Sequence, residues 1–150
     1  MTIKQFRKHV AETSVNKVMN DRESTVTFRV LGIISAVGRM HLFAEQEGKR
    51  FPSALRDLEF QFAALCYYLK YEPPVIEPED NPTYTLPQLT ESVFDLAYKL
   101  FRQLNGRRGS LKTILDDIEK ALVNLYVVYD RALSFNGGEG ITRDRLVTPN

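Results

Sequence analysis

Four acidic residues in the second half of the chain have the types and the spacing of a divalent-cation site. They are Glu91 and Asp95, followed by Asp116 and Glu119. Residues four apart share one face of an α-helix, so the first two carboxylates should point the same way. Mg²⁺ is usually held by a few carboxylates while substrate phosphates supply further oxygens. We therefore expect Mg²⁺ to bind here if the helices that carry these acids approach each other.

The same acids also fit a simpler interpretation, as parts of a solvated helix surface. Lys99 lies four residues after Asp95, and Lys112 and Lys120 lie four residues before and after Asp116. Ion pairs of this kind contribute only about 0.3–0.5 kcal/mol each. The sequence leaves both interpretations open.

A helical wheel separates the acids of the sequence DDIE. With about 100° per residue, Asp116 lies roughly 160° from the apolar stripe, on the back of its helix, whereas Asp117 and Glu119 border the stripe on opposite sides. Val123 and Val127 fall on the same back face as Asp116. A helix that is apolar on two faces is covered on both, so we expect another helix or a second subunit over this face.

Helical apolar periods separated by turn signals run along the whole chain, and no segment shows a convincing strand alternation. We expect a single all-α domain of five helices with a four-helix-bundle core. The expected parts are an N-terminal helix (1–20), a first helical hairpin (25–71), a proline-rich linker (72–86), a second hairpin (87–135) and a tail (136–150).

Capping residues mark several of the expected helix ends. Ser24 or Thr25 would cap the first helix of the first hairpin, and Pro52 suits the first turn of the next helix. Thr85 and Gln88 have the spacing of a capping box for the helix that follows the linker.

The two expected hairpins resemble each other in sequence. Residues 54–71 align without gaps on residues 114–131, and Glu59 with Glu119 is one of the identical pairs. Two related amphipathic hairpins would bury their apolar faces against each other. Any two amphipathic helices share a period, however, so the alignment also fits helices that are unrelated.

Composition restricts the classes of function. The chain has 150 residues, a formal net charge of +1 and a single cysteine, Cys66. Near-neutral charge disfavours a nucleic-acid partner, and one cysteine excludes a disulfide framework and fits a reducing compartment. Cys66 is best interpreted as a small buried apolar residue. No apolar run approaches the roughly 18 residues of a membrane span, so we expect a cytoplasmic protein without a membrane partner.

The acids on successive helices resemble the motif of the MazG-like all-α nucleoside triphosphate pyrophosphohydrolases, which include the dimeric dUTPases. That family has E-x-x-E on one helix and E-x-x-D on the next. Here TESVFDLAYKLF, with Glu91 and Asp95, stands at the first pair, and DDIEKAL, with Asp116 and Glu119, stands at the second. The first pair is spaced by four residues and the acid types of the second are exchanged, so the motif is degenerate.

The resemblance implies a Mg²⁺-dependent hydrolase that converts a (d)NTP into the monophosphate and pyrophosphate. Mg²⁺ would be held by the four acids, Glu119 would be the catalytic carboxylate, and Lys112 or Arg108 would bind the substrate phosphates. The alternative is a catalytically inactive helical scaffold or protein-interaction module of the same fold. The two-faced helices favour a homodimer or a larger homo-oligomer in either case.

Overall fold

The computed structural model describes residues 1–13, 22–43, 50–104, 111–135 and 142–148. These residues contain helices and no strand, so the all-α prediction is confirmed for the described part of the chain. None of the described helices combines the length and the apolar character that a membrane span needs. The helices are α1 (Ile3–Thr13), α2 (Arg22–Phe43), α3 (Arg50–Tyr68), α4 (Leu86–Leu104), α5 (Leu111–Phe135) and α6 (Arg143–Val147).

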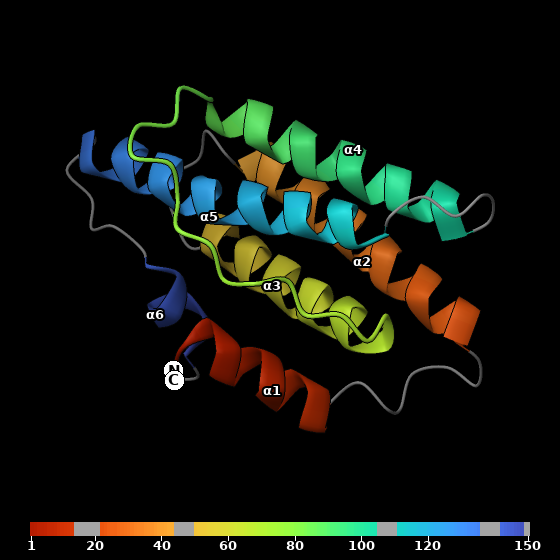
Figure 1. The fold of residues 1–150 in the computed structure, drawn as a ribbon. Helices are drawn as coiled ribbons and strands as arrows, with labels where there is room; N and C mark the ends of the chain where they lie inside the picture. Colours follow the sequence, from red (N-terminus) through yellow and green to blue (C-terminus); the bar gives the residue numbers. More distant parts are fainter. Residues whose placement is uncertain (14–21, 44–49, 105–110, 136–141, 149–150) are drawn as a thin grey trace.

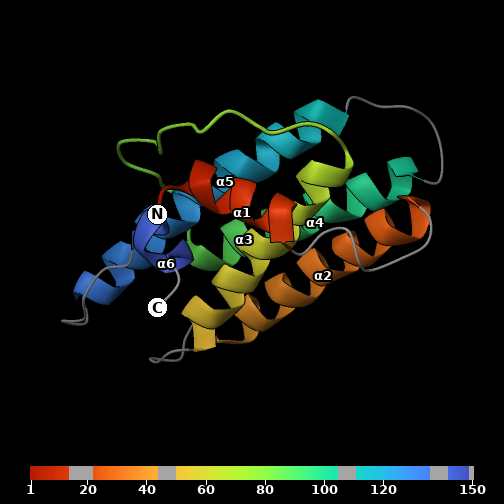
Figure 2. The same ribbon diagram turned by 90° about the horizontal axis from the view of Figure 1, so that it is seen from below.

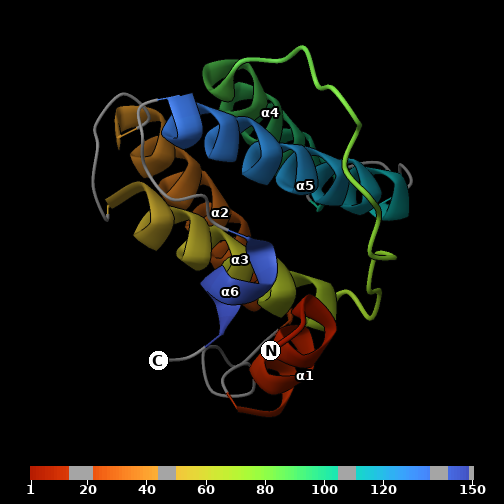
Figure 3. The same cartoon turned by 90° about the vertical axis from the view of Figure 1, so that its left-hand side faces the viewer.

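The long helices pack as two hairpins that form one bundle. Helices α2 and α3 lie side by side, as do α4 and α5, and α2 also packs against α4 (Figures 1 and 2). Helices α1 and α6 lie on the side of α3 that faces away from α4 (Figure 3). The two ends of the described chain meet there, because the amino group of Met1 donates a hydrogen bond of 2.9 Å to Oγ1 of Thr148.

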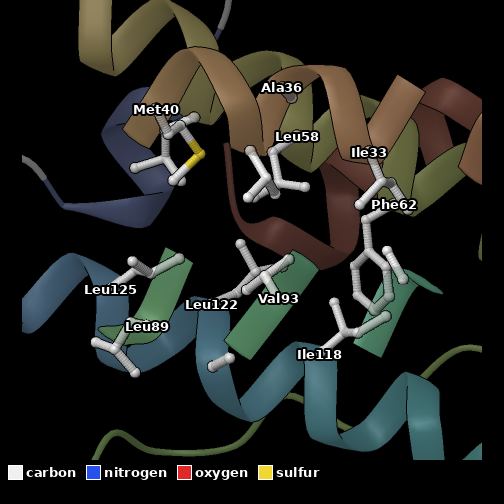
Figure 4. Packing of buried hydrophobic residues seen from close by; sticks show 14 of the residues in the cluster. Ile33, Ala36, Met40, Leu58, Phe62, Leu89, Val93, Ile118, Leu122 and Leu125 are labelled. Atoms are coloured by element: carbon white, nitrogen blue, oxygen red, sulfur yellow. The ribbon is translucent and has the colours of Figure 1, made fainter. Parts of the chain in front are cut away.

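Side chains from both hairpins share one hydrophobic core. Helix α3 is central, as its apolar character on all sides predicts, and packs against α1, α2 and α6. Full burial of one large aliphatic or aromatic side chain contributes about 1.5–3 kcal/mol relative to exposure. Ten residues of this core are labelled in Figure 4: Ile33, Ala36, Met40, Leu58, Phe62, Leu89, Val93, Ile118, Leu122 and Leu125.

Helix α1 is held against α3 by a smaller apolar cluster. Ile3, Phe6 and Val10 pack onto the small residues Ala63 and Ala64 of α3. Small side chains at this contact let the two helices approach closely.

The predicted helix ends are confirmed at α3 and α4 and wrong at α2. Gln88 donates its backbone N–H to Oγ1 of Thr85 at 3.2 Å, and Thr85 donates its own to Oε1 of Gln88 at 2.9 Å. Pro52 is the third residue of α3, within the expected first turn. Ser24 and Thr25 are not caps, because α2 begins at Arg22 and Thr25 is buried in the bundle.

The proline-rich linker crosses the outer face of α5 as an extended chain (Figure 1). Its backbone is fastened to that helix at two points. Glu79 donates its N–H to Oδ1 of Asn124 at 3.1 Å, and Nη1 of Arg131 donates to the carbonyl oxygen of Pro82 at 3.0 Å.

The linker covers the second apolar face of α5. Val123 and Val127 line one hollow together with Val75 and Pro78 of the linker. We expected a helix or a second subunit at this place, and the structure instead covers it with an extended segment of the same chain.

Residues 142–148 differ from the expected tail. They include α6, in which Leu146 and Val147 are buried against the rest of the chain. Oγ1 of Thr142 caps this short helix by accepting a hydrogen bond from the N–H of Arg145. The two apolar side chains and Arg143 give this segment enough contacts to dock on the helices.

Candidate functional site

The predicted metal ligands do not meet at one place. Within the ranges that the structure describes, no group of three or more His, Cys, Asp or Glu side chains is placed to hold a metal ion. Glu91 and Asp95 are exposed on α4, and Glu91 borders a groove toward α2. Asp116 contacts Tyr71, which follows the end of α3, and Glu119 lies in the interior. Arg108, the other predicted phosphate ligand, falls outside the described residues.

Asp116 of α5 binds Tyr71, the residue directly before the linker. The hydroxyl of Tyr71 donates a hydrogen bond of 2.8 Å to its Oδ1, and this bond, with a smaller effect of burial, raises the pKa of Tyr71. Lys112 lies over the same ring, with its Nζ 5.5 Å from the ring centroid. Asp116 therefore has a hydrogen-bonding partner that the helical wheel did not reveal.

The ion pairs of the alternative interpretation are also absent at the described residues. Lys120 lies 3.9 Å from a carboxylate oxygen of Glu79 in the linker, and no ion pair joins it to Asp116. Asp95 and Lys99 are both exposed and do not form an ion pair with each other. The acids of α4 and α5 thus form neither a cluster nor the predicted i,i+4 pairs.

Glu119 is enclosed by two arginines. It has no solvent-exposed surface, and both of its carboxylate oxygens accept hydrogen bonds from guanidinium groups. Arg7 of α1 binds Oε2, and Arg143 of α6 binds both oxygens, with a distance of 3.0 Å from Nη2 to Oε2. The catalytic and metal-binding roles predicted for Glu119 would require it to leave these partners.

Glu59 of α3 completes the buried ion network, which we define as Arg7, Glu59, Glu119 and Arg143. Arg143 binds Glu59 as a fork, with 2.9 Å from Nε to Oε2 and 3.1 Å from Nη2 to Oε1. Burial alone would lower the pKa of Arg143, but the two glutamates outweigh it and raise that pKa. Two positive and two negative groups balance in the interior, and the network joins α1, α3, α5 and α6.

Sequence reasoning identified the acids of this network but not its arginines. The alignment of the two hairpins paired Glu59 with Glu119 at positions bordering the apolar stripes. A buried carboxylate requires a counter-charge, so this pairing was a usable signal that cations would be found nearby. Arg7 and Arg143 lie in segments that carry no motif, and only the docking of α1 and α6 brings them to the acids.

A group of exposed apolar side chains lies where α2 and α4 pack together. We call it the α2–α4 face and define it by Leu31, Leu42, Phe94 and Tyr98, which are 53%, 66%, 43% and 49% exposed. With about 100° per residue, Leu31 and Leu42 lie on the side of α2 opposite its buried residues, and Phe94 and Tyr98 lie on the exposed side of α4. Exposed apolar groups gathered on one face are typical of interaction sites.

A groove between the two helices borders this face at Phe94. Its volume is about 230 Å³, and Glu91 and His41 provide its charged and titratable groups. Gly38 lies at the groove, and a Cβ atom placed there would meet nothing within 4 Å. The face therefore has large side chains at its margins and open space between them.

Comparison with protein-family models, with curated proteins and with solved structures gives no match. The arrangement of the described residues therefore carries the functional argument.

Proposed function

We propose that this chain is a non-catalytic helical scaffold that self-associates through the α2–α4 face. The supporting observation is the exposure of four large apolar side chains on two adjacent helices of the bundle. Isolated exposed apolar residues need no explanation, but a group of them on one face is typical of a protein-binding surface.

The size pattern along α2 favours a second copy of this chain as the occupant. The outward stripe of α2 has Leu31 and Leu42 as large residues and Ser35 and Gly38 as small residues between them. If two α2 helices pack antiparallel around Ser35, Leu31 of each copy enters the space beside Gly38 of the other. Such a pairing uses the same surface twice, which is the usual form of a two-fold interface.

Charge does not oppose this association. The formal net charge is +1, so two copies would repel each other only weakly. The back of α5, which the sequence suggested as an interface, is covered by the linker. The α2–α4 face is consequently the apolar surface that we assign to self-association.

The proposal is tested by analytical ultracentrifugation of paired tyrosine variants. Tyr98→Glu places a charge in the proposed interface, whereas Tyr84→Glu places it within the linker at a matched exposure of 48%. We expect a wild-type dimer, a dissociation constant raised at least about tenfold by Tyr98→Glu, and no change for Tyr84→Glu. Leu31→Glu should act like Tyr98→Glu. A wild-type chain that is monomeric at all accessible concentrations would refute the proposal.

The Mg²⁺-dependent pyrophosphohydrolase is a second proposal, supported by the pair of exposed carboxylates on α4. Glu91 and Asp95 are both accessible and share one side of that helix. Pyrophosphate release from a panel of (d)NTPs, with Mg²⁺ or Mn²⁺, tests it in the wild type, Asp95→Asn and Asp116→Asn. Metal-dependent release that both variants reduce would support a catalytic site, and no release from any substrate would exclude it.

A further inference from the structure

A second surface feature is a cavity between α1, the end of α3 and the start of the linker. Its volume is about 800 Å³. The charged residues of its lining are Lys4, Arg7 and Lys8 of α1, Lys70 after α3, and one acid, Glu72. The described residues of the lining thus have four cations and a single carboxylate, although the whole chain has a net charge of only +1.

The three lysines of this cavity have no acidic partner among the described residues. Lys4 and Lys8 lie four residues apart on the exposed side of α1, and Lys70 is exposed at the end of α3. The ion pairs of the described chain involve other cations. Among the described lining residues the one acid is Glu72, and it lies 3.8 Å from Nη1 of Arg7, the arginine that also binds Glu119.

Lys70 occupies a backbone position that normally favours glycine. Its φ angle is 56°, in the left-handed region. The N–H of Tyr71 bonds to the carbonyl of Cys66 at 3.1 Å and that of Lys70 to the carbonyl of Tyr67 at 3.1 Å, which together form a Schellman motif. Glycine would adopt this conformation at no steric cost, whereas the Cβ atom of Lys70 strains the backbone where the helix ends. Its ammonium group, by contrast, suits the cavity.

The rest of the lining is mostly apolar or aromatic. Ala11 of α1, Ala63 and Tyr67 of α3, and Pro74 of the linker contribute to it. Cavities of several hundred Å³ with apolar walls and a few charged groups are typical of small-molecule sites. The walls can therefore contact an organic group while the lysines bind its charge.

We propose that this cavity binds a small organic molecule that carries at least one phosphate monoester. Lys4, Lys8 and Lys70 neutralise the phosphate, because ammonium groups form charge-assisted hydrogen bonds with phosphate oxygens. Tyr67 and the alanine side chains contact the organic part. The site shares no residue with the α2–α4 face and is independent of self-association.

Isothermal titration calorimetry with phenyl phosphate and with inorganic tripolyphosphate, in low salt and a metal chelator, tests the assignment. We expect saturable binding to the wild type. The dissociation constant should rise by about tenfold or more for Lys70→Gly and for the double variant Lys4→Gln/Lys8→Gln. Lys99→Gln, which removes an exposed lysine of α4, is the matched control and should bind as the wild type does.

Lys70→Gly also separates binding from folding. Its midpoint of thermal unfolding should be equal to or higher than that of the wild type, because glycine relieves the left-handed strain. Lower affinity in a variant that is at least as stable supports a ligand role for the side chain. The assignment is overturned if the wild type does not bind phenyl phosphate, whether or not it binds tripolyphosphate. It is also overturned if Lys99→Gln loses as much affinity, or if polyglutamate binds and phenyl phosphate does not.

A second arm identifies the source of the phosphate. Sedimentation with phosphatidylcholine vesicles, with and without phosphatidic acid, shows whether a lipid headgroup is bound. Binding to the acidic vesicles that Lys70→Gly reduces assigns the cavity to a lipid phosphate, and binding restricted to the soluble probes assigns it to a free metabolite.

Discussion

Glu119→Gln is expected to lower the free energy of unfolding by about 3–5 kcal/mol, because it removes one of two buried carboxylates that neutralise two buried arginines. Glu119 has no exposed surface and accepts three charge-assisted hydrogen bonds, from Nη2 of Arg7 and from Nη1 and Nη2 of Arg143. A glutamine has similar volume, so the change deletes charge with little effect on packing.

The expected loss falls mainly on Arg7. Arg143 retains its two hydrogen bonds to Glu59, whereas Arg7 retains the carbonyl of Pro73 at 3.1 Å and a carboxylate of Glu72 at 3.8 Å. Hydrogen bonds to charged groups contribute about 1.5–3 kcal/mol each, and an unpaired buried charge adds a desolvation cost. A domain has only about 5–15 kcal/mol of net stability, so this single change should bring the protein near its unfolding threshold.

Urea denaturation, followed by far-ultraviolet circular dichroism, measures this loss as a shift of the midpoint at unchanged slope. Asp57→Asn is the matched control, since it deletes a carboxylate of α3 whose pair with Arg39 has side-chain exposures of 36% and 44%. An exposed pair of this kind contributes at most about 1 kcal/mol. Equal losses in Glu119→Gln and Asp57→Asn would refute the structural role of the network.

Four further substitutions probe other parts of the fold. Gly32→Ala should destabilise the protein, because its new Cβ would lie 2.5 Å from the side chain of Gln61 and displace the Oε1 that accepts a hydrogen bond from buried Arg29. Gly38→Ala, with nothing within 4 Å, should stabilise the protein by up to about 1 kcal/mol. Thermal unfolding at concentrations too low for self-association checks both signs. Tyr71→Phe should cost about 1 kcal/mol by removing the bond to Asp116 and should speed amide hydrogen exchange in the linker, and unchanged exchange would contradict the fastening. Burial raises the pKa of Cys66 from 9.0 to about 12. The contribution of the protonated thiol to the free energy of unfolding is therefore complete below pH 9 and is lost as the pH rises toward 12. This loss is about 1.4 kcal/mol per pH unit, and it should disappear in Cys66→Ala.

The features that the sequence predicted well are local. The helical periods of α3, α4 and α5 and the capping box of Thr85 and Gln88 depend on residues within a few positions of one another. The prediction at Ser24 and Thr25 was wrong for the same reason. A capping signal considers only neighbouring residues, whereas Thr25 is placed inside α2 by its burial in the bundle.

The placement of the acids is not local. Asp116 and Glu119 are three residues apart on one helix, yet one contacts Tyr71 beyond the end of α3 and the other lies beneath α1 and α6. Their partners, Tyr71, Arg7 and Arg143, come from segments far away in the chain. A helical wheel gives the direction of a side chain but not the element that lies in that direction.

The sequence by itself determined the helices, the extended linker and the need for a cover on both faces of α5, because periodicity, proline content and apolar character are local properties. Tertiary structure alone decided that the linker provides this cover and that Arg7 and Arg143 enclose Glu119. The physical reason is the cost of burial. A buried apolar face needs apolar contacts, and a buried carboxylate needs a cation or hydrogen-bond donors. Several segments of a chain could supply these partners, and only the packing of the whole fold selects one.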